Sequence, residues 1–171
     1  MAEVIKEFQR VLEIAKHNVH LAEERVLNEL EDRRIARTEV GTEIFLEQNL
    51  KALHEEVIFS LKPLQTLQPN PLEWEELRQL CRHFCEDQIY LWSTFCIKTW
   101  HQSETTIALI IKELKAKLYM DINLFIDGEK SLALQEKRGV DWSIILKICL
   151  IGVAAGITGY LLPKIIAYVL S

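Results

Sequence analysis

Glycine and proline are scarce in this chain, which has 6 Gly and 4 Pro among 171 residues. Their scarcity excludes collagen-like and other Pro/Gly-rich architectures. No stretch alternates apolar and polar residues between turn dipeptides, so nothing in the sequence indicates β-strands. Hydrophobic residues, by contrast, make up 49% of the chain. That fraction is enough to build a packed core, and it argues against a disordered protein.

Motifs of common enzyme classes are also missing. Gly41, Gly128 and Gly139 are isolated, so there is no glycine-rich phosphate loop. No Glu-x-x-His tetrapeptide provides ligands for a di-metal site in a bundle. The formal net charge of −5 gives no electrostatic reason for nucleic-acid binding. We therefore expect a protein that is not an enzyme, uses no cofactor and binds no nucleic acid.

Cysteine and histidine give only weak indications of a metal site. The segment Cys81-Arg-His-Phe-Cys85 comes nearest, because residues four apart share a helix face. However, His83 points away from that face and no second ligand pair is near. We interpret both cysteines as small apolar core residues. His17 and His20 lie among charged residues and are expected on a solvated helix surface.

Apolar residues at helical spacing predict four long helices, at about residues 3–36, 42–61, 71–100 and 104–126. Thr42 is the expected N-cap of the second helix, and Asn70 followed by Pro71 that of the third. Asp127-Gly128 is expected to interrupt the fourth. The mixed charges of residues 23–34 are typical of a solvated face with i,i+4 ion pairs, and a polar docking surface is the alternative. The fold class is therefore all-α, an antiparallel four-helix bundle over residues 1–126, with a linker at 127–141.

Acidic residues are absent from the C-terminal segment, residues 142–171. Its charges are Lys147 and Lys164, so residues 1–141 carry a formal charge of −7. The uncharged run 148–163 would span about 24 Å as a helix, and residues 143–146 extend it to about 30 Å, the thickness of a bilayer core. Trp142 and Tyr160 lie where interfacial aromatic residues are expected. The segment is predicted to be a single transmembrane helix.

The position and flanks of this segment predict a tail-anchored protein. Lys137 and Arg138 precede it, which favours a cytosolic location for the N-terminal body. The modest length favours a thin membrane, either the mitochondrial outer membrane or the endoplasmic reticulum. Gly152 and Gly156 form a GxxxG pattern and Gly159 repeats the small-residue spacing. This pattern allows close contact with another helix, including a homo-oligomer, although glycine is common in membrane helices generally.

The stretch Gly152–Lys164 (GVAAGITGYLLPK) resembles the membrane anchors of Bcl-2-type proteins. Residues 139–145 (GVDWSII) are similar to the Gly-Val-Asn-Trp-Gly-Arg signature of that family, with Ser143 and Ile144 in place of its Gly and Arg. The resemblance covers residues 139–164 and no death motif of the Leu-x-x-x-Gly-Asp type occurs upstream. It implies membrane attachment and a helical protein partner.

Aromatic residues are frequent in the third predicted helix and allow two interpretations. They could pack in the core, or they could line a groove for a partner helix. The candidate partner surface consists of Trp74, Trp92, Phe95 and Trp100. We expect an adaptor or regulator that binds a protein at an organelle surface. The alternative is a membrane-perturbing or Bcl-2-like apoptosis regulator whose amphipathic helices insert into the membrane.

Overall fold

The computed structural model describes residues 2–137, and this part of the chain is all-helical without strands. It contains four α-helices, α1 (Ala2–Asp32), α2 (Glu39–Leu61), α3 (Pro71–Trp100) and α4 (Glu104–Lys137), and the 3₁₀ helix η1 (Lys62–Leu67). The predicted all-α class and the four predicted helices are confirmed here. The predicted transmembrane helix lies outside the described residues.

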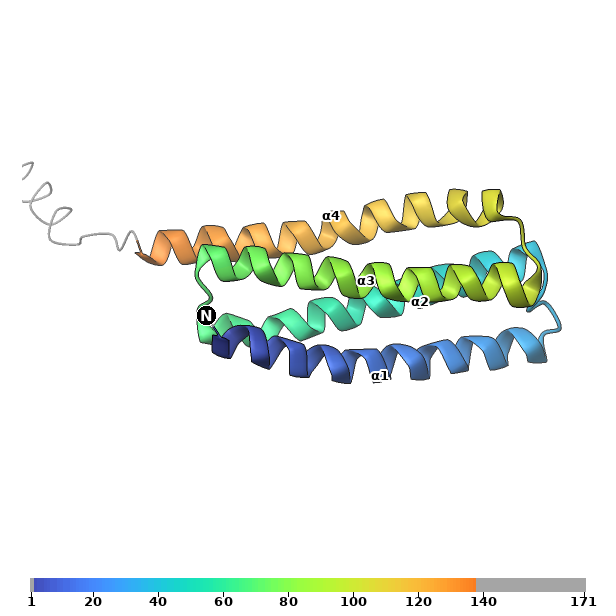
Figure 1. Ribbon diagram of the computed structural model, residues 1–171, viewed down its shortest axis with the longest axis horizontal. Helices are drawn as coiled ribbons and strands as arrows, with labels where there is room; N and C mark the ends of the chain where they lie inside the picture. Colours follow the sequence, from blue (N-terminus) through green and yellow to red (C-terminus); the bar gives the residue numbers. More distant parts are fainter. Residues whose placement is uncertain (1, 138–171) are drawn as a thin grey trace, which may run out of the picture. The chain divides into compact units, whose positions relative to one another are not determined.

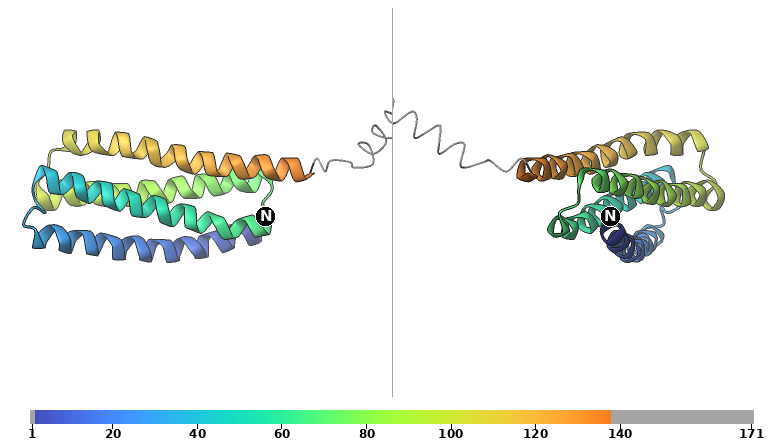
Figure 2. Two further views of the ribbon diagram at one scale, coloured as in Figure 1. Left: turned by 180° about the vertical axis from the view of Figure 1, so that it is seen from behind. Right: turned by 60° about the vertical axis from the view of Figure 1, so that its left-hand side comes forward.

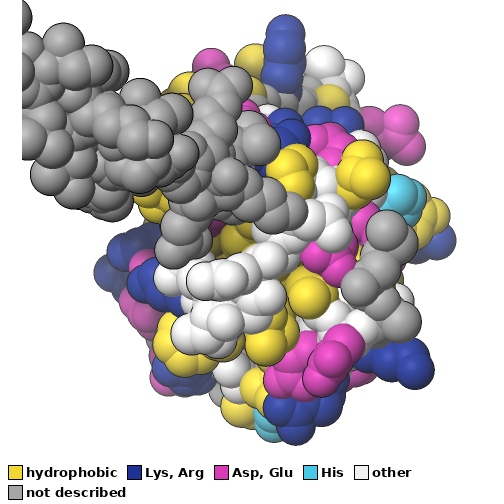
Figure 3. Space-filling view, turned by 90° about the vertical axis from the view of Figure 1, so that its left-hand side faces the viewer, with side chains coloured by type: hydrophobic (Ala, Val, Ile, Leu, Met, Phe, Trp, Pro, Cys, Tyr) yellow, Lys and Arg dark blue, Asp and Glu magenta, His cyan; other side chains and the backbone are white. Residues whose placement is uncertain are grey.

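Consecutive helices run in opposite directions and pack as a bundle, which forms a compact unit ending at Ala133 (Figure 1). α2 and α3 lie side by side in the middle, with α1 on one side of this pair and α4 on the other (Figure 2). Helices that run in the same direction, α1 with α3 and α2 with α4, are therefore also neighbours. At the end where α1 begins, hydrophobic side chains are interspersed with acidic and basic ones (Figure 3).

The predicted heptad stripe of α1 faces the core. Phe8, Ala15, Val19 and Val26 are buried along one side of the helix. Small side chains such as Ala15 let α1 and α2 pack closely. Each fully buried large apolar side chain contributes roughly 1.5–3 kcal/mol. The α1–α2 pair is thus held mainly by apolar packing.

The connection between α1 and α2 differs from the prediction. α1 ends at Asp32 rather than near residue 36, and Thr38 rather than Thr42 caps α2. The Thr38 hydroxyl accepts a hydrogen bond from the Gly41 N–H at 3.0 Å. Gly41 lies in the first turn of α2, where a Cβ would stand 1.9 Å from the Ile35 carbonyl oxygen. This close approach of the loop therefore requires glycine at position 41.

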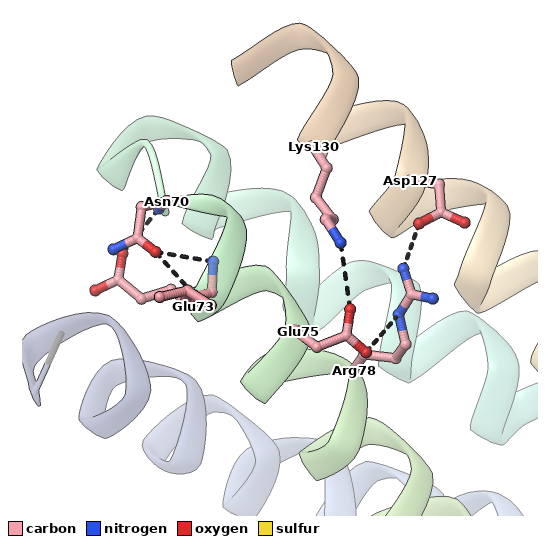
Figure 4. A network of polar contacts seen from close by, with 7 residues as sticks. Asn70, Glu73, Glu75, Arg78, Asp127 and Lys130 are labelled. Atoms are coloured by element: carbon pink, nitrogen blue, oxygen red, sulfur yellow. Dashed lines mark hydrogen bonds and ion pairs between the residues drawn. The ribbon is translucent and has the colours of Figure 1, made fainter. Parts of the chain in front are cut away.

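The start of α3 confirms the predicted cap. The Asn70 side chain accepts from the backbone N–H groups of Leu72 and Glu73, at 2.9 and 3.1 Å. Glu73 in turn accepts from the Asn70 N–H at 2.8 Å, which completes a capping box (Figure 4). Pro71 at the first helical position has no N–H to leave unsatisfied. α3 then ends at Trp100, as predicted.

The predicted interruption at Asp127-Gly128 is wrong, because α4 continues through it to Lys137. The predicted linker 127–141 therefore begins inside a helix. A glycine costs an exposed helix only about 1 kcal/mol relative to alanine. Ionic contacts hold these turns to α3: Arg78 bonds to Asp127, and Lys130 Nζ lies 3.2 Å from Glu75 Oε2 (Figure 4). These contacts offset the weak helix propensity of Gly128.

Candidate functional site

Every residue of the predicted membrane anchor lies outside the described residues. These are Trp142, Lys147, Gly152, Gly156, Gly159, Tyr160 and Lys164. Within residues 2–137, no helix combines the length and the apolar character that crossing a membrane requires.

Three of the four aromatic residues in the candidate partner surface are buried. Trp74 and Trp92 are each 1% exposed, and Trp100 is 7% exposed. Phe95 is half-buried. Trp74 and Trp92 thus pack in the core, which was one of the two interpretations of the aromatic residues, and they do not line a groove for a partner helix. Phe95 and the edge of Trp100 are left within reach of a partner.

The buried face of α3 is formed mainly by tryptophan, cysteine and aliphatic side chains. Trp92 is buried, whereas Leu91 next to it is 55% exposed. Cys85 and Cys96 lie in the core, and the neighbouring rings of Phe84 and Phe95 are half-buried. Small cysteine side chains let α3 approach its neighbours along this line. The larger aromatic rings lie at its margin.

Phe95 and Trp100 form a cluster of rings with Phe45 of α2. The Phe95 and Trp100 centroids are 5.2 Å apart, and Phe45 lies 5.1 Å from Trp100 and 5.7 Å from Phe95. Both contacts of Trp100 are edge-to-face, the arrangement that aromatic quadrupoles favour. The rings brace one another, so the exposed edges have fixed positions.

A groove of about 620 Å³ opens over this cluster, between the end of α1, the α1–α2 loop and the end of α3. Its apolar surface comes from Leu27, Ala36, Phe95 and Trp100, and its polar rim from Glu31, Arg34, Arg37, Thr38 and Thr99. The two loops that border this end are joined, since the Gln102 side-chain amide donates to the Arg37 carbonyl at 3.0 Å. This is the candidate site.

The two rim arginines differ from the other arginines of the described residues. Arg33 pairs with Glu29 at 3.2 Å, which confirms one predicted i,i+4 pair. Arg10, Arg25, Arg78 and Arg82 each have a carboxylate, carbonyl or aromatic partner. Within residues 2–137, only the guanidinium groups of Arg34 and Arg37 make no hydrogen bond, ion pair or ring contact. Arg34 belongs to residues 23–34, the mixed-charge stretch for which a polar docking surface was the alternative interpretation, and Arg37 lies beyond that stretch.

Arg34 also adopts an unusual backbone conformation. Its φ of 58° is left-handed, and the next N–H, of Ile35, donates to the Leu30 carbonyl at 3.0 Å. This is the Schellman geometry that ends a helix, and glycine is the residue most often found at this position. A side chain here costs about 1 kcal/mol. The arginine lies at the negative end of the α1 dipole, which offsets part of that cost.

The thiols of Cys81 and Cys85 lie in the core, as predicted. Cys81 and Cys85 are fully buried. Burial raises the pKa of the Cys81 thiol well above its usual range and that of Cys85 to about 12. A protonated thiol is a poor metal ligand and a poor nucleophile. In the described part of the chain, no three metal-binding side chains gather at one place.

A polar cluster links α3 to α4 at the surface. Glu86 accepts hydrogen bonds from Lys115 at 2.7 Å and from the Tyr119 hydroxyl at 2.8 Å. These bonds, that of Lys115 first, lower the pKa of the Glu86 carboxyl. Burial and the bond to Glu86 raise the pKa of Tyr119 above its usual range. The cluster thus holds α3 to α4.

A second groove, of about 610 Å³, follows the α1–α3 seam farther from the loops. Its apolar residues include Leu12, Phe84 and Leu91. Its rim carries Lys16 as well as Glu13 and Asp87, a net charge of −1, so the charge of its lining is opposite to that of the candidate site.

The chain matches no protein-family model, no curated protein and no solved structure.

Proposed function

We propose that this protein is a membrane-anchored helical bundle that binds a protein partner at the surface of an intracellular membrane. Residues 142–171 anchor the chain in the mitochondrial outer membrane or the endoplasmic reticulum, and the bundle faces the cytosol. The protein recruits or sequesters its partner without catalysing a reaction. The pair Gly152 and Gly156 offers a place where a second membrane helix can approach.

The observation that carries the proposal is the groove at the ends of α1 and α3, where half-buried Phe95 and the edge of Trp100 are within reach of a partner. An apolar surface with a polar rim is what a protein segment needs in order to bind. The anchor is supported by the sequence, since residues 148–163 carry no charge and residues 142–171 no acidic side chain.

Proximity labelling of the full chain and of a chain lacking 142–171 tests this proposal. The full chain should label proteins of one organelle surface, and the deletion should label cytosolic proteins at random. Ala155→Arg provides a matched point variant, because a charge at the centre of a span costs roughly 2.5–3.5 kcal/mol in insertion. Ser171→Arg is its control and should behave as the wild type. Equal labelling by all four chains would refute the anchor.

Release of dye from liposomes measures the competing activity. The proposal predicts no leakage from the purified full chain at any lipid composition. Leakage that depends on the chain would instead support a protein whose amphipathic helices insert into the membrane.

A further inference from the structure

We infer that the candidate site, the groove between the end of α1, the α1–α2 loop and the end of α3, binds an acidic segment of the protein partner, in which carboxylates pair with Arg34 and Arg37 and an apolar side chain contacts Phe95 and Trp100. The inference rests on the proposed function, because it specifies the chemistry of the partner that the bundle holds. Three features of the groove support it: its unpaired cations, its fixed apolar surface and the conformation of Arg34.

Charge complementarity determines the kind of segment. Both guanidinium groups are exposed, and neither has a partner in the described residues. Arginine presents a planar fork of donors that matches a carboxylate in two parallel hydrogen bonds. Glu31 lines the same groove, so the two arginines and this glutamate give the rim a net charge of +1. Because residues 1–141 carry −7 overall, this positive rim is local, and an acidic segment would be repelled by much of the remaining surface.

The apolar part of the groove indicates that the ligand carries an apolar side chain in addition to its carboxylates. The edges of Phe95 and Trp100 are held by Phe45 behind them, so they need no reordering when a ligand arrives. Leu27 and Ala36 extend this surface on the other wall. An aliphatic or aromatic side chain between two carboxylates would cover these edges and exclude water from the ion pairs. Such anchors dominate the affinity of many protein interfaces.

Arg34 allows a test in which the folding and binding effects have opposite signs. Glycine suits its left-handed conformation better than arginine does, so Arg34→Gly should not lower the stability of the bundle. The same substitution removes one of the two cations from the rim. A role limited to the structure of the loop would therefore show no binding loss in this variant.

The experiment measures binding of two fluorescein-labelled helical peptides to the full chain in detergent micelles. One peptide carries Glu residues around a central Trp and Leu pair, and the other carries Lys in place of each Glu. We expect the Glu peptide to bind at least about tenfold more tightly, because its carboxylates pair with Arg34 and Arg37, whereas the Lys peptide places ammonium groups beside the same two cations. Arg34→Gly and Arg37→Gln should each weaken the Glu peptide about tenfold. Arg25→Gln, outside the groove, is the matched control and should have no effect.

Thr99, an exposed residue of the rim, gives a second pair of variants. Thr99→Lys should strengthen binding of the Glu peptide, and Thr99→Glu should weaken it. The inference is overturned if the Glu peptide does not bind, if the Lys peptide binds as well, or if the Arg34 and Arg37 variants bind normally. It is also overturned if phosphatidylserine vesicles or an oligonucleotide compete as strongly as unlabelled Glu peptide. Anchor-dependent proximity labelling would survive all of these results, so the two proposals fail separately.

Discussion

Replacing Gly41 with alanine should destabilise the bundle, although the residue lies in a helix, where alanine is normally favoured. The added Cβ would stand 1.9 Å from the Ile35 carbonyl oxygen and 2.8 Å from its carbon. The Ile35 carbonyl oxygen accepts two hydrogen bonds from Thr38, one from its backbone N–H at 3.0 Å and one from its hydroxyl at 2.8 Å. Both bonds are lost if the loop moves away by more than about 1 Å to make room for the Cβ. Two hydrogen bonds and the cap are worth about 3 kcal/mol together. The gain in helix propensity returns about 1 kcal/mol at most.

Gly128→Ala is the matched control, because nothing lies within 4 Å of a Cβ added there. It should stabilise α4 by about 0.5–1 kcal/mol. Urea unfolding of the full chain in micelles can be followed by circular dichroism. The midpoint should be lower than that of the wild type for Gly41→Ala and higher for Gly128→Ala. For a chain of this size the net loss of about 2 kcal/mol in Gly41→Ala corresponds to a fall in Tm of about 4–8 °C. An unchanged midpoint for Gly41→Ala would refute the loop geometry, and a less stable Gly128→Ala would refute a continuous α4.

Other consequences can be checked with the same preparation. His101, with a φ of 56° after the last turn of α3, should tolerate His101→Gly with a gain of up to about 1 kcal/mol, and a clear loss of stability would contradict this. Thr38→Ala should cost about 1 kcal/mol of unfolding free energy, since it removes the cap of α2. The thiol of Cys85 should react with Ellman's reagent only after unfolding, and prompt reaction in the native state would contradict its burial. The folded-state pKa of Glu86 is lowered, so its stabilising effect is fully present above the ordinary glutamate pKa and is lost as the pH falls through the lowered value. In Glu86→Gln the free energy of unfolding should therefore fall less steeply in acid than in the wild type.

Helix number and most helix ends could be predicted because local signals specify them. Asn70 and Pro71 mark the start of α3 through capping chemistry that acts within four residues. The heptad stripe of α1 identified its buried face for the same reason, since periodicity is a local property. These features needed no knowledge of the neighbouring helices.

Features that depend on tertiary contacts could not be predicted. Thr38 and Thr42 are both good caps, and the local sequence does not decide between them. The interruption expected at Gly128 is prevented by ionic contacts with α3, far away in the sequence. The groove arises where two chain segments about 60 residues apart, ending near Arg34 and Trp100, meet at one end of the bundle. Arg34 and Arg37 could not be singled out from the sequence, because it is their lack of a side-chain partner among residues 2–137 that distinguishes them.

Alkaline extraction of cell membranes tests the central proposal, membrane anchoring by residues 142–171, most directly. The full chain should stay in the membrane pellet at high pH, and the chain lacking 142–171 should be recovered in the soluble fraction with an intact helical spectrum. If the deleted chain still pellets and resists extraction, or if the full chain is extracted, the proposed anchor is contradicted.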